Sequence, residues 1–322
     1  MKNKLLNSGF GVGNIIFIAA VILALPLRIY QYVAGILEPG TGFYAENSWS
    51  TYALYAVIIA AVAASVVVGI IKKKSLGFSN EATRNPLIGI FSALSAAGLV
   101  IDVFTHLNVL GRSHPSLYAD TVPVGVPSYN ILLTQIIVSL VTALFFVILA
   151  IGSFSGKTSG TEYRILSLTP VFWSIIRMVS RFMRTISYVR VSELLFEMVM
   201  LMFMIMFFMA FAQCNSKVNE KDCIWKVAAY GLPAALLALV CSVPRIILSL
   251  IGSADLIYSQ SSVEFADLGI ALFIIAVVLT KVITKTESDE SEEKSEETEE
   301  SAETEESAEK TETEESPVST EE

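Results

Sequence analysis

The sequence predicts an all-α polytopic integral membrane protein, a bundle of about eight transmembrane helices followed by a disordered acidic tail. Of the 322 residues, 53% are apolar and 16% are charged, whereas soluble proteins average about 25% charged residues. Seven predominantly apolar runs with few charged residues reach the ~20 residues that a helix needs to cross a bilayer. The charge is also divided unevenly, because residues 1–285 carry a net charge of +7 and residues 287–322 a net charge of −16.

The seven long runs are separated by short connections, so each is expected to form one membrane-spanning helix. They cover residues 12–37, 52–71, 87–110, 129–151, 194–212, 224–250 and 265–283.

An eighth segment, 165–189, is ambiguous because its apolar first half is followed by three arginines. If it crosses the membrane and the N-terminus is inside, 13 Lys and Arg lie in cytoplasmic segments and 3 in outer segments. If it lies flat on the cytoplasmic face, the outer count rises to 6 and the inner count stays at 13. Positive residues concentrate in cytoplasmic loops. This distribution favours eight spans, with seven as the runner-up.

A hairpin between the eighth segment and the next span also favours eight. If the chain turns near Val191, Arg184 lies level with about Glu197, and Arg190 lies level with Glu193. The two glutamates are one helical turn apart on one face. Charges at membrane depth are costly unless they are paired, and this hairpin would pair them.

The chain is therefore expected to form two parts, a transmembrane domain (1–285) and a disordered tail rich in Glu, Ser and Thr (286–322). The predicted location is the plasma membrane, with both termini in the cytoplasm. Within the tail, the sequence TEESAE of 298–303 is repeated in 304–309. A segment with so few apolar residues cannot offset the entropy of ordering. Its negative charge excludes nucleic acid as a partner, and leaves either a cationic protein partner or a merely solvated segment.

Cys214 and Cys223 flank a polar loop. With eight spans this loop is cytoplasmic and the thiols are expected to stay reduced. With seven spans it faces outward, and a disulfide becomes plausible. Because no histidine lies near the two cysteines, they make a poor zinc site. Neither a metal nor a cofactor is expected.

Small residues recur at every fourth position in two spans. Such spacing lets helix backbones approach closely, so these faces are expected to pack against neighbouring helices. The residues are Ala56, Ala60 and Ala64 in one span and Gly89, Ala93 and Ala97 in the other.

Function is expected at the charged and polar residues within the spans, which are rare there and often functional. Asp102 and His106 are four residues apart on one helical face, a spacing that lets the aspartate orient the imidazole. In the assumed orientation the candidates lie in the outer half of the spans or, for Arg177, near the middle. The candidate ligand-binding residues are Arg28, Asp102, His106, Arg177, Arg181, Arg184, Glu197 and Arg245.

These residues allow three interpretations. An arginine-rich cluster that faces the interior would attract a small anion, because guanidinium forks bind carboxylate and phosphate. Alternatively, the charges pair with one another and hold the helices in register, or the arginines contact lipid headgroups.

Catalysis has little support, since the chain has two histidines and lacks the common hydrolase and Walker A motifs. A protein that is not an enzyme is favoured. The expected function is to bind or transport a small anionic solute through the outward-facing cluster. The alternative is a non-catalytic scaffold or accessory subunit whose acidic tail recruits a cationic partner.

Overall fold

Helices dominate the computed structural model, and one is found in each of the eight predicted segments. The structure describes residues 11–37, 44, 48–78, 84–112, 129–156, 165–182, 191–216, 220–257 and 264–284. The long helices in these ranges are α2 (Gly11–Val33), α3 (Trp49–Ile71), α4 (Pro86–Arg112), α5 (Tyr129–Ser155), α6 (Thr169–Phe182), α7 (Val191–Asn215), α8 (Glu220–Ile251) and α9 (Phe265–Lys281). Short elements are the 3₁₀ turns η1 (Leu166–Leu168) and η3 (Ala254–Leu256) and the strands β1 (Leu76–Phe78) and β2 (Val282–Thr284).

Six of these helices, α2, α3, α4, α5, α7 and α8, are long and apolar enough to cross a membrane. Their outward faces carry large apolar side chains, among them Ile22, Phe104 and Ile151, each more than 60% exposed. Soluble proteins rarely expose apolar surface on this scale. The chain is thus an all-α protein built for a lipid bilayer. The remaining long helices are shorter, at 14 residues for α6 and 17 for α9.

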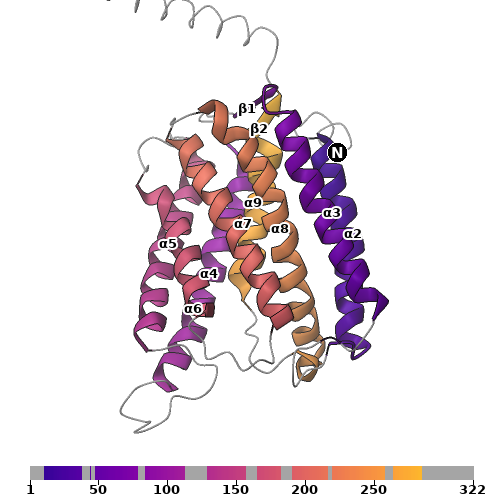
Figure 1. Cartoon of the computed structure of the whole chain (residues 1–322). Coiled ribbons are helices and arrows are strands. Elements are labelled where there is room, and N and C mark those ends of the chain that lie inside the picture. Colours follow the sequence, from indigo (N-terminus) through magenta and orange to yellow (C-terminus); the bar gives the residue numbers. More distant parts are fainter. Residues whose placement is uncertain are drawn as a thin grey trace, which may run out of the picture. The chain divides into compact units, whose positions relative to one another are not determined.

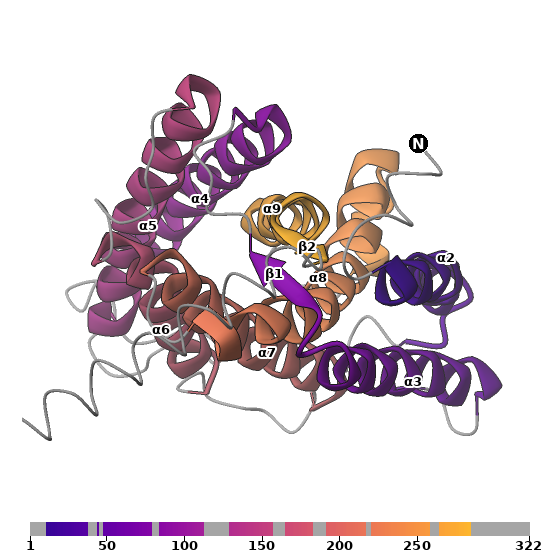
Figure 2. The same cartoon turned by 90° about the horizontal axis from the view of Figure 1, so that it is seen from above.

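Helices α8 and α9 lie in the middle of the bundle, and the others surround them (Figure 1; Figure 2). Helix α8 packs against α2, α3, α7 and α9, and α4 packs against α5 and α9. In the most apolar 18-residue stretch of α8, 67% of the residues are buried, whereas in that of α3 28% are buried. Consequently α8 and α9 are the helices best placed to gather side chains from several directions.

Helix α6 belongs to this bundle, because it packs against α5 and α7. Its polar face is turned inward, with Ser174, Arg177 and Arg181 all buried. Trp173 Nε1 donates a hydrogen bond to Ser139 Oγ of α5 at 3.1 Å. Such contacts place α6 among the other helices. Residues 183–190, which hold Arg184 and Arg190, lie outside the described residues, as does the tail after residue 284.

Helices α4 and α9 approach each other closely. A Cβ on Gly98 would lie 2.8 Å from the backbone of Phe265, and one on Gly269 would lie 2.7 Å from the Cα of Ser95. Real Cβ atoms do not come this close, so only glycine fits at both positions. These contacts fix where α9 begins relative to α4.

The predicted small-residue ridges are wrong as packing faces. Ala56, Ala60, Ala93 and Ala97 are exposed on the bundle surface, and α3 instead buries a face that includes Leu54, Ile58 and Ser65. The physical reason is that lipid-facing and helix-facing positions are both apolar, so spacing alone does not separate them. Gly89 does approach another helix, at the ring of Phe154.

One end of the bundle carries the two short strands, and we call it the sheet end (Figure 1). Strand β1 follows α3 and pairs with β2, which follows α9. The opposite end of the bundle is called the ladder end below.

Cys214 and Cys223 form a disulfide with their Cα atoms 5.7 Å apart. Free thiols, expected for the eight-span arrangement, are therefore not found. The short antiparallel connection between α7 and α8 brings the two side chains together. Gly69, near the end of α3, packs against Ala229, near the start of α8. This contact places the disulfide at the sheet end.

Candidate functional site

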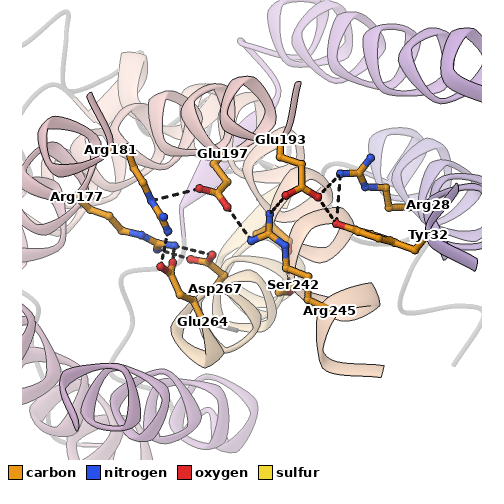
Figure 3. A network of polar contacts seen from close by, with 11 residues as sticks. Arg28, Tyr32, Arg177, Arg181, Glu193, Glu197, Ser242, Arg245, Glu264 and Asp267 are labelled. Atoms are coloured by element: carbon orange, nitrogen blue, oxygen red, sulfur yellow. Dashed lines mark hydrogen bonds and ion pairs between the residues drawn. The ribbon is translucent and has the colours of Figure 1, made fainter. Parts of the chain in front are cut away.

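Eight buried charged side chains, seven from five helices and one from the residue before α9, form a continuous chain of ion pairs in which arginine and carboxylate alternate (Figure 3). Each is between 2% and 6% exposed. We call this chain the charge ladder. In order of contact it consists of Arg28, Glu193, Arg245, Glu197, Arg181, Glu264, Arg177 and Asp267.

All members lie at the ladder end because of where they stand on their helices. Arg28, Arg181 and Arg245 are near the ends of α2, α6 and α8, whereas Glu193 and Asp267 are near the starts of α7 and α9. Because these helices are antiparallel, the C-terminal ends of α2, α6 and α8 lie beside the N-terminal ends of α7 and α9. The bundle topology thus collects charges that are far apart in the sequence.

The α6–α9 side of the ladder is tightly paired. Arg177 donates through both terminal nitrogens to Asp267, and the contact from Nη2 to Oδ2 is 2.7 Å. Glu264 is paired with both Arg177 and Arg181. The Arg177 guanidinium also lies 5.0 Å from the ring centroid of Trp173. This two-pronged geometry is typical of strong arginine–carboxylate pairing, and it fastens α6 to α9.

Glu197 of α7 joins the two sides of the ladder. Its Oε1 accepts a hydrogen bond from Arg245 Nη1 at 2.7 Å. Its Oε2 lies 3.2 Å from Arg181 Nε. One carboxylate therefore connects α6, α7 and α8.

On the α2–α8 side, two arginines contact the carboxylate of Glu193 at longer distances. Its Oε1 lies 3.3 Å from Arg28 Nη2, and its Oε2 lies 3.5 Å from Arg245 Nη2. The Tyr32 hydroxyl also donates a hydrogen bond to Oε1 of Glu193, at 2.5 Å. Arg245 Nε is buried and has no hydrogen-bond partner in the described part of the chain.

Arg28 is surrounded mainly by neutral groups. Its Nη1 donates to Gln31 Oε1 at 3.0 Å and to the Tyr44 hydroxyl at 2.6 Å. The guanidinium carbon lies 4.9 Å, 5.5 Å and 5.9 Å from the ring centroids of Tyr32, Phe196 and Tyr44. Burial raises the pKa of Tyr44 to about 12, against the opposing effect of the Arg28 charge. Tyr44 is therefore a neutral hydrogen-bonding group at physiological pH.

Asp102 and His106 contact other helices from neighbouring positions on α4. Asp102 accepts hydrogen bonds from the backbone N–H groups of Phe265 and Ala266, both at 3.1 Å. His106 Nε2 lies 3.3 Å from the Gln135 side-chain nitrogen of α5. Asp102 thus caps the start of α9, where Glu264, the residue before the helix, makes no capping bond of its own.

Of the eight candidates from the sequence, five lie in the ladder. They are Arg28, Arg177, Arg181, Glu197 and Arg245. Asp102 and His106 lie on α4 outside it, and Arg184 is outside the described residues.

Sequence reasoning missed Glu264 and Asp267. A signal was present, since two acids one turn apart at the start of an apolar span need cationic partners. Their spacing also resembles that of Arg177 and Arg181. With these two acids and Glu193, the described part of the ladder has four arginines and four carboxylates, so the formal charges of these eight residues cancel.

A groove of about 410 Å³ lies on the apolar surface between α2 and α3, and none of its lining residues belongs to the ladder. It is lined by Ile22, Leu23, Pro26, Leu27, Tyr30 and Trp49. Within the described ranges, no cluster of three or more His, Cys, Asp or Glu could hold a metal ion.

Comparison with known proteins gives no relative from which a function could be inferred. No model of a protein family matches the chain, and neither a curated protein nor a solved structure matches it. The geometry of the ladder is accordingly the best guide to function.

Proposed function

We propose that the chain is an eight-span membrane protein that binds or transports a small anionic solute at the α2–α8 side of the charge ladder. The observation that supports this most directly is that Arg28 and Arg245 share one carboxylate, through contacts of 3.3 Å and 3.5 Å. Charge-assisted hydrogen bonds of this type are normally 2.7–2.9 Å. Arg245 Nε, which has no hydrogen-bond partner among the described residues, adds a donor that an anion could use.

The rest of the ladder supports this role by holding the site in place. The tight contacts of Arg177, Arg181 and Glu264 fasten α6 to α9, and Glu197 connects them to α8. Buried charges are costly in a membrane protein and commonly mark substrate or ion pathways. A preformed and rigid surround reduces the ordering that a ligand has to impose.

The proposed orientation places the ladder end outside the cell and both termini in the cytoplasm. It rests on the distribution of Lys and Arg, since the run Lys72, Lys73 and Lys74 follows α3 at the sheet end. Helices α6 and α9 are included as spans because both pack within the bundle. The solute would then enter from the outer face.

The test is anion binding by the purified protein in lipid nanodiscs, with acetate, benzoate and inorganic phosphate as probes. Thermal stability is measured against probe concentration, because a ligand that binds the folded state raises it. Arg28→Gln and Arg245→Gln should each weaken binding by ~10-fold or more, the loss expected for one charge-assisted contact. Arg84→Gln, at an exposed arginine, is the control. Binding that survives both ladder substitutions in folded protein would refute the proposal.

A second candidate function is a membrane scaffold whose tail recruits a cationic protein. It is favoured by the balanced pairing of four arginines with four carboxylates, which also suits a purely structural role. Deleting residues 287–322 separates the two candidates. A scaffold loses its crosslinked partner on deletion and binds no anion with or without the tail. An anion-binding protein keeps the anion affinity measured for the full chain.

A further inference from the structure

Asp102, His106 and Gln135 form a buried polar cluster between α4 and α5, outside the charge ladder. Asp102 and His106 are four residues apart on α4, so both side chains lie on one face of that helix. His106 Nε2 lies 3.3 Å from Gln135 Nε2 of α5. Ionisable groups buried within membrane spans often belong to proton relays, and histidine changes its charge near neutral pH.

Gln135 can serve the imidazole of His106 in two ways. Its amide nitrogen faces His106 Nε2, and the amide N–H can donate only to an Nε2 that carries no proton. The amide oxygen, Oε1, is buried and has no hydrogen-bond partner within the described ranges. Rotation of the amide by half a turn would bring this oxygen to Nε2, where it can accept from a protonated imidazole. The pair therefore suits both protonation states of Nε2.

Asp102 adds a negative charge that the ladder does not balance. Among the described residues, the buried charged groups are the four arginines and four carboxylates of the ladder and Asp102. Asp102 accepts the first two N–H groups of α9, and the start of a helix contributes about half of a positive elementary charge. A proton on His106, one turn away, would compensate the remaining charge.

The charged groups around His106 come from its own helix and from α9. Asp102 lies one turn away on α4. Helix α9 packs against α4 and brings Glu264 and Asp267 at its start, and Arg177 lies within electrostatic reach of Asp102. Helix α5 places the neutral Gln135 at this level, and its tyrosine at position 129 is nearly two turns away. Protonation of His106 therefore acts on a neighbourhood that includes members of the ladder.

Asp102 links this cluster to the ladder through the first residues of α9. The two N–H groups that it accepts stand between Glu264 and Asp267 in the sequence. Both of these carboxylates belong to the ladder. The close approach of α4 and α9 at this point leaves little room for the two helices to move separately. A change of charge at His106 therefore affects groups that position two ladder carboxylates.

We infer that His106, with Asp102 and Gln135, forms a proton-binding site, and that a proton bound there accompanies the anion bound at the ladder. The second part rests on the proposed anion-binding function and names its coupling ion, H⁺. A proton from the solution binds Nε2, the Gln135 amide rotates, and Nε2–H donates to Oε1. The positive charge gained offsets the negative charge that a monoanion brings into the buried interior.

The experiment follows the His106 imidazole by nitrogen-15 NMR in full-length protein reconstituted in lipid bilayers. The chain has two histidines, so His114→Gln leaves His106 as the one imidazole signal. The signal is titrated from about pH 5.5 to about pH 8, the range in which histidine ordinarily changes its charge, with and without benzoate. His106 should titrate in both series, and saturating benzoate should raise the midpoint by ~1 pH unit, because the bound anion stabilises the protonated form.

Linkage is reciprocal, so benzoate should bind up to ~10-fold more tightly at the acid end of this range than at the alkaline end. His106→Gln should remove this pH dependence, whereas His114→Gln, the matched control at a histidine outside the described residues, should retain it. Asp102→Asn should leave His106 titrating but reduce the shift that benzoate produces. If His106→Gln protein does not fold, the NMR midpoints of the His114→Gln protein decide the question.

The possible outcomes distinguish the inference from the function on which it rests. A His106 signal that does not change across the pH range would overturn the proton site. Equal midpoints with and without bound benzoate would overturn the coupling, as would a pH-dependent affinity that persists in His106→Gln. If benzoate binds to no variant at any pH, the proposed function is wrong, and the titration alone then decides the proton site.

Discussion

Arg177 illustrates at the residue scale how strongly the ladder members depend on one another. It is 2% exposed and pairs with both Glu264 and Asp267. Removing one partner of a buried ion pair leaves an uncompensated charge, which typically costs ~3–5 kcal/mol. Arg177→Met should therefore reduce the free energy of unfolding by about this amount, measured by SDS titration of the purified protein in mixed micelles.

The matched double variant tests the reason for this cost. In Arg177→Met with Asp267→Leu, the remaining Glu264 keeps its contact with Arg181, so the loss of stability should be smaller than in the single variant. Replacing both members of a buried pair by apolar residues is often nearly neutral. Arg84→Met, at an exposed position, should change stability by less than ~0.5 kcal/mol. Equal costs for the single and double variants would argue against pairing.

The contact between an arginine of α6 and Glu197 is the part of the site that the sequence predicted. Arginines in an apolar segment require acidic partners, so the meeting of the α6 arginines with Glu197 followed from helical spacing alone. Arg181 contacts Glu197, whereas Arg184, the arginine predicted to lie level with Glu197, is outside the described residues. Glu264 and Asp267 were missed because more than 80 residues separate them from Arg177 and Arg181. Only the packing of α6 near α9 brings these groups together.

At the scale of elements, the crossing of α4 and α9 depends on glycine. A methyl group on Gly98 would lie 2.8 Å from the Phe265 backbone. This is the place where the N–H groups of Phe265 and Ala266 donate hydrogen bonds to Asp102. Gly98→Ala should destabilise the protein by ~1–3 kcal/mol, the usual cost of overpacking a close contact. Thermal unfolding in detergent measures the effect.

Gly111 provides a control on the same helix, because nothing lies within 4 Å of a Cβ built there. Gly111→Ala should leave stability unchanged or raise it slightly, since alanine favours helix more than glycine does. If both alanine variants unfold at the same temperature, the close approach of α4 and α9 is not required for the fold.

The positions of the helices were more predictable than their packing faces. An apolar run must be about 20 residues long to cross a bilayer, and this constraint places α5 and α8 within a few residues of the predicted 129–151 and 224–250. No comparable constraint determines whether an alanine faces lipid or another helix, because alanine suits both positions. That is why Ala93 and Ala97 were assigned to a contact and are exposed instead.

At the scale of the whole molecule, the lysines and the disulfide of the sheet end indicate opposite sides of the membrane. The lysines after α3 favour a cytoplasmic location for this end. The disulfide between Cys214 and Cys223 lies at the same end, although disulfides are rare in the cytosol and typical of oxidising compartments. If the sheet end is cytoplasmic, the disulfide has to persist in a reducing compartment, and if the sheet end is outside, it lies in an oxidising one.

Labelling of intact cells tests the orientation directly. The proposed topology predicts that Cys214 and Cys223 stay protected from a membrane-impermeant thiol reagent, even after an impermeant reductant, and react only when the membrane is opened. Cys241 is buried and should not react in either case. Gly111→Cys, at an exposed residue of the ladder end, introduced with Cys214→Ser and Cys223→Ser, should be labelled from outside. External protease should leave residues 287–322 intact for the same reason.

Labelling of the native cysteines together with loss of the tail would contradict this orientation. It would place the sheet end outside, where the disulfide is expected to be stable, and would move the anion site to the cytoplasmic face.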